Sequence, residues 1–310
     1  MNGIITTENM LLTRSPSREE CIEYLRNEGI LEYFNIGEKK EQGIFDAVDK
    51  NNKTPFAPVP EDLYRLHTLV RRRKVFNVLE FGLGFSTIVM ADALKKNKDD
   101  FYSSNEQPEI RITQPFKLYS VDASEYWIDT FSKKYSKIFP YFDILELTYS
   151  KCNIGEHCGQ ICHFYMNIPN VITDFIYLDG PSGHDDDVQG SINGLSFIDC
   201  LERTVISGDL LKMESTLLPG TMIIVDGRVN NVRFLKNNLK RSYNFEYIDD
   251  EDISVFELCE LPLGKINRNQ INYSLGENYY KRERERERER EVKYRNLFVV
   301  AKISVLHTCV

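Results

Sequence analysis

The sequence predicts an α/β fold built on a doubly wound, mostly parallel sheet. Short apolar strands alternate with helical patterns through most of the chain, as in folds where crossover helices join parallel strands. One of these strands, at residues 75–81, ends in a glycine turn that leads directly into a helix. Near the end of the chain, β-prone stretches follow one another without a long helix between them, which predicts a terminal antiparallel pairing.

The expected elements follow from hydrophobic periodicity and from turn residues. Strands are expected at residues 75–81, 117–122, 142–148, 174–179, 221–226, 245–250, 254–258 and 296–305. Helices are expected at residues 16–35 with a break near Gly29, at 61–73, after the glycine turn, at 124–135 and at 194–214. The helix at 61–73 should bury Leu63, Leu66, Leu69 and Val70, and the polar residues 97–116 predict a long surface loop.

The chain divides into two parts. Residues 1–60 predict a helical appendage that ends in the proline-rich linker NNKTPFAPVP, and residues 61–310 predict the main α/β domain. Two roles for the appendage are open, closing over a substrate and covering an edge of the sheet. Residues 281–291, KRERERERERE, place like charges four positions apart, which opposes a helix and predicts a solvated, mobile insert. An arm for nucleic acid or an acidic partner is the alternative for this insert.

Composition bounds the classes of function. A chain of 310 residues that is 42% hydrophobic can bury a full core. The net charge of −8 and a pI near 5.4 argue against a surface that tracks a phosphate backbone. No apolar run approaches the length of a membrane span, and the start of the chain lacks an export signal. We therefore expect a cytoplasmic protein, whose seven cysteines would be reduced thiols.

One cluster of thiols and imidazoles invites a metal interpretation. It consists of Cys152, His157, Cys158, Cys162 and His163. Structural zinc sites usually combine a short cysteine pair with a second, distant pair, whereas here the cysteines are separated by five and three residues and no second pair follows. The pattern favours a loop that contains cysteines over a zinc site.

The turn after the first strand, within VFNVLEFGLGFST, predicts a cofactor site. Gly82 and Gly84 leave backbone N–H groups bare beside a helix N-terminus, which suits an anionic or zwitterionic small molecule. A purely structural turn is the alternative. A dinucleotide fingerprint would need a third glycine where Thr87 stands and an acid about 20 residues on, and both are missing.

A second acid lies where the next strand ends. Asp122 closes KLYSVD, so its carboxylate is expected beside the glycine turn, where it can accept two hydrogen bonds from a ribose diol. The alternative is that Asp122 caps the helix that follows it.

The ordered series Glu80-x-Gly82-x-Gly84, Asp122, DFIYLDG and GTMIIVDGR resembles the class I S-adenosylmethionine-dependent methyltransferases over roughly residues 60 to 302. This resemblance implies a Rossmann-like methyltransferase fold, a seven-stranded sheet with a terminal antiparallel strand. It also implies cofactor-binding roles for Glu80, Gly82, Gly84, Ser86 and Asp122, with the turn holding the methionine part and Asp122 the ribose. One departure is Ser86, which stands where the family motif commonly has a third glycine.

The reacting groups are expected where the fourth and fifth strands end, since ligands bind outside the carboxyl edge of a parallel sheet. Asp179, His184, Asp226 and Arg228 follow those strands. Asp179 or His184 would take the proton from a hydroxyl acceptor, with Asp179 preferred, and Arg228 suits a carboxylate or phosphate of the substrate. Ordinary turn chemistry and helix capping are the alternatives.

A metal-assisted variant stays open. Some O-methyltransferases that the chain resembles bind a divalent metal through acids after these two strands, and Asp179 and Asp226 match them. Gly227 stands where a third ligand is expected, so magnesium would need a substitute. The candidates are Asn230, Asn231 and Asp185.

The sequence therefore predicts S-adenosylmethionine-dependent O-methylation of a small-molecule or glycan-type acceptor. An NAD(P)-dependent oxidoreductase is the alternative enzyme, disfavoured by the missing third glycine and the displaced acid. A non-catalytic nucleotide-binding module on the same fold is the alternative from another class.

Overall fold

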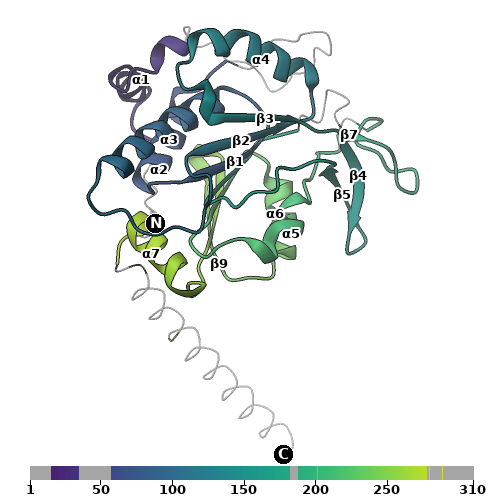
Figure 1. The fold of residues 1–310 in the computed structure, drawn as a ribbon. Helices are drawn as coiled ribbons and strands as arrows, with labels where there is room; N and C mark the ends of the chain where they lie inside the picture. The colour runs from purple at the N-terminus through teal and green to yellow at the C-terminus, as the bar shows by residue number, and fades with distance from the viewer. Residues whose placement is uncertain are drawn as a thin grey trace, which may run out of the picture.

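In a computed structural model of the protein, the described residues are 15–34, 57–181, 188–200, 202–277, 279 and 288. A seven-stranded sheet lies at the centre of this structure (Figure 1). Its strands are β1 (Asn77–Phe81), β2 (Lys117–Asp122), β3 (Leu145–Tyr149), β6 (Phe175–Leu178), β8 (Met222–Asp226), β9 (Tyr243–Ile248) and β10 (Ile253–Leu258). They are arranged in the order β3-β2-β1-β6-β8-β10-β9.

The sheet confirms the predicted fold class. All pairings among the first five strands of this order, β3, β2, β1, β6 and β8, are parallel. The strand β10 runs antiparallel to both of its neighbours, β8 and β9. Among the described residues, β9 and β10 form the terminal antiparallel arrangement. The strand order reverses between β1 and β6, and at such a switch point the carboxyl ends of the strands leave room for a ligand.

Helices cover both faces of this sheet (Figure 1). On one face pack α1 (Arg18–Asn27), α2 (Pro60–Arg72), α3 (Phe85–Ser103) and α4 (Glu125–Ile138). On the other lie α5 (Asp209–Met213) and α6 (Val229–Asn238). Successive strand residues alternate between the two core clusters, as the pleat requires: Val78 faces the first helical layer and Leu79 the second. A last helix, α7 (Gly264–Leu275), packs at the amino-terminal ends of the strands.

Local signals in the sequence set the helix boundaries as expected. Ser17 and Glu20 form a capping box that starts α1, and Gly29, at a φ of +76°, ends it before the 3₁₀ turn η1 (Leu31–Tyr33). Pro60 occupies the first position of α2, where a missing N–H costs nothing. The predicted inward residues of α2, Leu63, Leu66, Leu69 and Val70, are all buried.

The cysteine-rich stretch is a β-hairpin, so the predicted loop was wrong there. β4 (Cys152–His157) pairs antiparallel with β5 (Gln160–Tyr165), and the short β7 (Val188–Gln189) runs parallel to β4 in a second, three-stranded sheet. Cys158 and Gly159 both have positive φ, which is the geometry of a two-residue hairpin turn. The short turn joins the two strands that carry these cysteines and histidines.

Two other predicted boundaries were also wrong. The helix expected at 194–214 is reduced to α5 and the 3₁₀ turn η4 (Glu214–Thr216), because residues 206 and 208 pair their backbone with His163 of β5. The loop expected at 97–116 begins only after Ser103, where α3 ends. Asn97 lies within the helix because its buried side-chain amide donates hydrogen bonds to the carbonyl oxygens of Val70 and Val75.

Several predicted features lie outside the described residues. They are His184 and Asp185, the strand at 296–305, and all of the insert 281–291 except Arg288. Two further 3₁₀ turns among the described residues are η3 (Phe142–Ile144), within the predicted third strand, and η5 (Asp249–Glu251). In the part of the chain that the structure describes, no helix has the length and apolar character needed to cross a membrane.

Replacing Gly82 by alanine should lower the free energy of unfolding by more than about 2 kcal/mol. The residue has a φ of +104°, and an added Cβ would lie 2.6 Å from the amide nitrogen of Gly180. Gly29→Ala is the matched control, since Gly29 also has positive φ but no atom within 4 Å, so only about 1 kcal/mol should be lost. Urea unfolding of both variants measures the difference, and equal losses would contradict the steric constraint.

Candidate functional site

The glycine turn after β1 is held in place by Glu80. This side chain is fully buried, and its carboxylate oxygens accept hydrogen bonds from the hydroxyls of Ser86 at 2.5 Å and Thr87 at 2.6 Å. The Thr87 hydroxyl in turn accepts from the Gly84 amide at 3.1 Å. Burial raises the pKa of Glu80 to about 7 in spite of the two hydroxyl donors. Glu80 and Ser86 therefore fix the first turn of α3, and their contact with a cofactor stays a prediction.

The two glycines of the turn differ in what surrounds them. Gly82 has no room for a side chain, because its Cα faces Gly180 at the end of β6. At Gly84, the first atom that an added Cβ would meet is the Ser86 hydroxyl oxygen at 3.7 Å. Gly84 is also the N-cap of α3; it has no side chain to accept from the first-turn amides, and the Thr87 hydroxyl accepts from the Gly84 amide. Space for a ligand therefore lies on the Gly84 side, beside a helix N-terminus that favours negative charge.

Asp122 lies beside the same turn. One of its carboxylate oxygens accepts from the Leu83 amide at 2.8 Å, and the other accepts from the Ser124 amide at 2.7 Å. Asp122 thus ties the glycine turn to Ser124, the residue whose own side chain caps α4. A carboxylate can accept about four hydrogen bonds, so these two contacts are compatible with binding a ribose diol. Glu80 and Asp122 converge on one turn from neighbouring strands.

Asp179 and Asp226 follow neighbouring strands at this edge. Asp179 is exposed to solvent, and Asp226 is half-buried and accepts a hydrogen bond from the Tyr177 phenol at 2.5 Å. The surrounding protein atoms reduce the hydration of both carboxylates, which raises the pKa of each. The negative charge of Asp226 raises the pKa of Asp179 further. The positive charge of Arg228 acts in the opposite direction on both pKa values. The sheet therefore brings together two acids that can hold or accept a proton closer to neutral pH than an ordinary aspartate.

Arg228 cross-links the ends of β8 and β6. Its guanidinium donates to the backbone carbonyl oxygen of Asp179 and to that of Pro181, the latter at 2.8 Å. These bonds hold the two acid-bearing strand ends together. The role that the sequence suggested for Arg228, gripping an anionic group of the substrate, stays a prediction.

Helix α2 adds two charged residues that the sequence analysis did not select. Arg65 is buried and donates to the carboxylate of Asp62 at 3.0 Å and to that of Glu251 at 2.7 Å. Burial and the nearby Asp226 carboxylate raise the pKa of Asp62 to about 7. The first turn of α2 thus lies close to the acidic edge. Acids in a first helical turn are ordinary capping signals, so the sequence carried no sign of this placement.

The predicted substitutes for a third metal ligand are engaged elsewhere. The Asn230 amide donates to the Thr204 hydroxyl at 2.9 Å. Asn231 accepts from the Ser207 amide at 2.8 Å and donates to the Ser207 carbonyl oxygen at 3.2 Å. Asn231 uses both its amide oxygen and its amide nitrogen in these bonds, and a metal at this edge stays an alternative.

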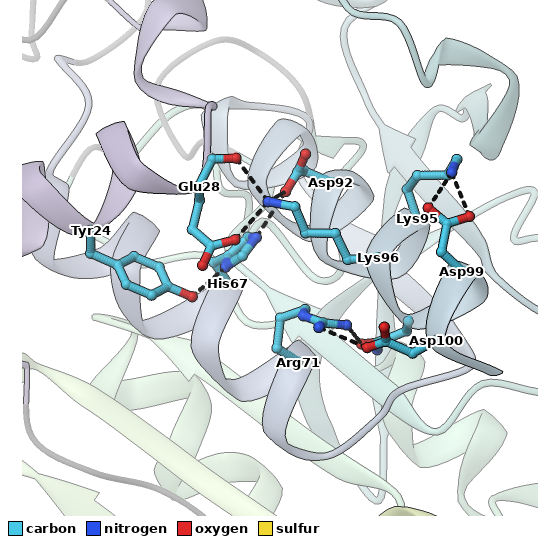
Figure 2. Close-up of polar contacts among 10 residues, drawn as sticks. Tyr24, Glu28, His67, Arg71, Asp92, Lys95, Lys96, Asp99 and Asp100 are labelled. Atoms are coloured by element: carbon cyan, nitrogen blue, oxygen red, sulfur yellow. Dashed lines mark hydrogen bonds and ion pairs between the residues drawn. The ribbon is translucent and has the colours of Figure 1, made fainter. Parts of the chain in front are cut away.

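A second polar cluster joins α1, α2 and α3 (Figure 2). Among the described residues, the ligand atoms of Glu28, His67 and Asp92 lie within 4.8 Å of one another, close enough to hold a metal ion. The Lys96 ammonium, however, contacts Asp92 at 2.7 Å and Glu28 at 2.6 Å, while the buried His67 bonds Asp92 at 2.9 Å and Tyr24 at 2.7 Å. The lysine supplies the cation, so this cluster fastens α1 to the main domain.

Comparisons with known proteins give distant matches. No family model and no curated protein matches the chain. Solved structures that match include the SAH-bound methyltransferase PaMTH1 of Podospora anserina, with 12% identity, coverage of 80% of this chain and 90% of that one, and a TM-score of 0.39. The O-methyltransferase TomG of Streptomyces achromogenes, in complex with SAM, has 10% identity, coverage of 82% and 94%, and a TM-score of 0.35. An O-methyltransferase of Bacillus cereus in complex with SAH has 13% identity, coverage of 78% and 92%, and a TM-score of 0.30.

These matched proteins belong to the class that the sequence motifs resemble. At 10 to 13% identity and TM-scores of 0.30 to 0.39, the likeness carries no argument about activity. The functional conclusion therefore depends on the residues of this chain and their geometry.

The raised pKa of Glu80 should make part of the stability depend on pH. The folded value, about 7, exceeds the reference value of 4.5, so the protonated side chain favours the folded state, and this contribution is lost as pH rises from about 4.5 through 7. Between about pH 5 and pH 7.5, the free energy of unfolding should fall more in the parent than in Glu80→Gln. Urea unfolding at both pH values measures this, with Glu109→Gln, at an exposed loop position, as control. Identical pH dependence in the parent and Glu80→Gln would contradict the shift.

Proposed function

We propose that the protein is a cytoplasmic class I S-adenosylmethionine-dependent methyltransferase that methylates a hydroxyl group of a small molecule or a glycan-type acceptor. The observation that carries this proposal is the glycine turn at the switch point of the sheet. It is open at Gly84, lies at the N-terminus of α3, and is bound by the Asp122 carboxylate at the end of the neighbouring strand. These are the groups that a zwitterionic amino acid and a ribose require.

The residues at the turn suit this cofactor better than a dinucleotide. The α3 N-terminus and the Gly84 backbone would hold the carboxylate of the methionine part, and Asp122 the ribose, while Glu80, Gly82 and Ser86 shape the turn. When bound, S-adenosylmethionine supplies the methyl group. In a dinucleotide-binding motif, the third glycine allows the helix to pack closely against the strand. Thr87 stands at that position here, and its hydroxyl donates a hydrogen bond to buried Glu80. The turn therefore departs from the dinucleotide motif at this position.

The acid pair Asp179 and Asp226 supports transfer to a hydroxyl. A hydroxyl group must lose its proton as its oxygen is methylated, and a carboxylate whose pKa is raised toward neutrality is suited to accept that proton. Asp179 is exposed to solvent at this edge and is the proposed proton acceptor. Asp226, hydrogen-bonded to Tyr177, lies at the end of the neighbouring strand. Arg228 holds both strand ends in register for this task.

Binding of S-adenosylhomocysteine tests the cofactor part of the proposal. Calorimetry should detect it for the parent, and Gly84→Leu should weaken it by at least about tenfold, because the new side chain enters the open space. The φ of −164° at Gly84 is extended backbone that leucine adopts, so folding should be retained. Asp122→Ala should also weaken binding, by about tenfold, through loss of the ribose contact.

Asp129→Ala, at an exposed position of α4, is the matched control and should bind like the parent. NAD should not bind to any of these proteins. Binding of NAD alone, or affinity for S-adenosylhomocysteine that neither variant changes, would contradict the proposed function.

A further inference from the structure

The β4–β5 hairpin begins and ends beside the glycine turn. The Ser150 amide, just before β4, donates to the Asp122 carbonyl oxygen at 2.9 Å. At the other end, the Tyr165 ring of β5 lies 5.5 Å from the ring of Phe81, the residue that precedes Gly82. Both ends of the hairpin therefore lie next to the candidate cofactor site, although its strands belong to a separate sheet.

Two buried side chains of β5 have polar atoms without partners. His163 and Tyr165 are two residues apart on one strand and so point to the same side of it. They are 0% and 3% exposed, yet among the described residues neither ring nitrogen of His163 nor the Tyr165 hydroxyl has a hydrogen-bond partner. Buried polar atoms are usually paired in folded proteins, so three such atoms on one strand face offer hydrogen bonds to a polar ligand.

Both apolar and charged groups lie near this pair. Tyr165 shares its core cluster with Cys152, Val188 and Phe197. Burial and the Arg228 guanidinium lower the pKa of His163 to about 3, and burial raises that of the Tyr165 phenol. Both side chains are thus neutral at pH 7. A neutral imidazole has one donor and one acceptor, and a phenol has one of each, which together complement a hydroxyl group.

On the premise of the proposed methyltransferase activity, we propose that His163 and Tyr165 bind the hydroxyl-bearing part of the methyl acceptor. The acceptor is then a small, uncharged hydroxyl compound with an apolar body. A glycan presents hydroxyl groups on all sides, whereas the neutral His163 and Tyr165 side chains together complement a single hydroxyl group. An anionic acceptor would meet the carboxylates of Asp122 and Asp179 at the same edge. This inference chooses the small-molecule class over the glycan class.

The test uses the full chain saturated with S-adenosylhomocysteine and three probes: phenol, cyclohexanol and methyl glucoside. Ligand-observed NMR titration should show binding of phenol and cyclohexanol but not of methyl glucoside. Tyr165→Phe keeps the ring against Phe81 and removes only the hydroxyl, and should weaken binding of both alcohols by about fivefold to tenfold. His163→Phe should weaken it similarly. Tyr243→Phe, which removes a hydroxyl from β9 at the opposite end of the sheet, should leave binding unchanged.

Alcohol binding that neither β5 variant changes, failure of both alcohols to bind, or preferred binding of methyl glucoside would each overturn this inference. If His163→Phe fails to fold, Tyr165→Phe decides alone. Failure of the proposed function is distinguishable, because it would appear first as the absence of S-adenosylhomocysteine binding to the parent protein. If the parent binds S-adenosylhomocysteine and Tyr165→Phe binds the alcohols as tightly as the parent does, only the assignment of the acceptor site is wrong, and the proposed function is unaffected.

Discussion

Two strand ends meet through bare backbone at the centre of this fold. A Cβ at Gly82 would lie 2.6 Å from Gly180, and a Cβ at Gly180 would lie 2.6 Å from Gly82. The amide of Gly82 donates to the Val121 carbonyl oxygen, and that of Gly180 to the Phe81 carbonyl oxygen. Because β1 and β6 are the strands at which the sheet order reverses, this contact sets the separation between the glycine turn and Asp179. Every group of the candidate site is positioned relative to it.

The second constraint is electrostatic. The carboxyl edge gathers acids from α2, β2, β6 and β8, and their full ionisation in a partly dehydrated place would be unfavourable. Arg65 and Arg228 reduce the repulsion, and the raised pKa of acids such as Asp62 and Asp226 reduces it further. The edge therefore combines a fixed skeleton of ion pairs with carboxylates that can exchange protons. The first turn of α2 contributes to it directly, so the segment just after the linker is part of the site's surroundings.

The sequence predicted those parts of the molecule whose causes are local. The parallel strands, α2 and α4 follow from hydrophobic periodicity and capping residues, and the turn that Glu80 and Asp122 hold follows from the order of acids and glycines. The hairpin at 152–165 pairs residues that are close in sequence, around the turn at Cys158 and Gly159, and the loop predicted from the cysteine pattern was wrong. The irregular segment before α5 was not predicted, because its hydrogen-bond partner on β5 is remote in sequence. The backbone of residues 206 and 208 bonds to His163, and no periodicity within 194–214 encodes that pairing.

This division separates the two halves of the candidate site. The half proposed for the cofactor comes from one continuous motif, whereas the half proposed for the acceptor depends on contacts between distant segments. Asp209 accepts from the Tyr165 amide at 3.1 Å and from the Ser207 hydroxyl at 3.1 Å, and Asn231 of α6 grips Ser207 through two hydrogen bonds. Asn231, which the sequence suggested as a metal ligand, thus supports the segment that positions β5. Asp209, Ser207 and Asn231 thus hold the strand that carries His163 and Tyr165. Under the proposed assignments, the acceptor half of the site depends on this tertiary pairing, whereas the cofactor half depends on one local motif.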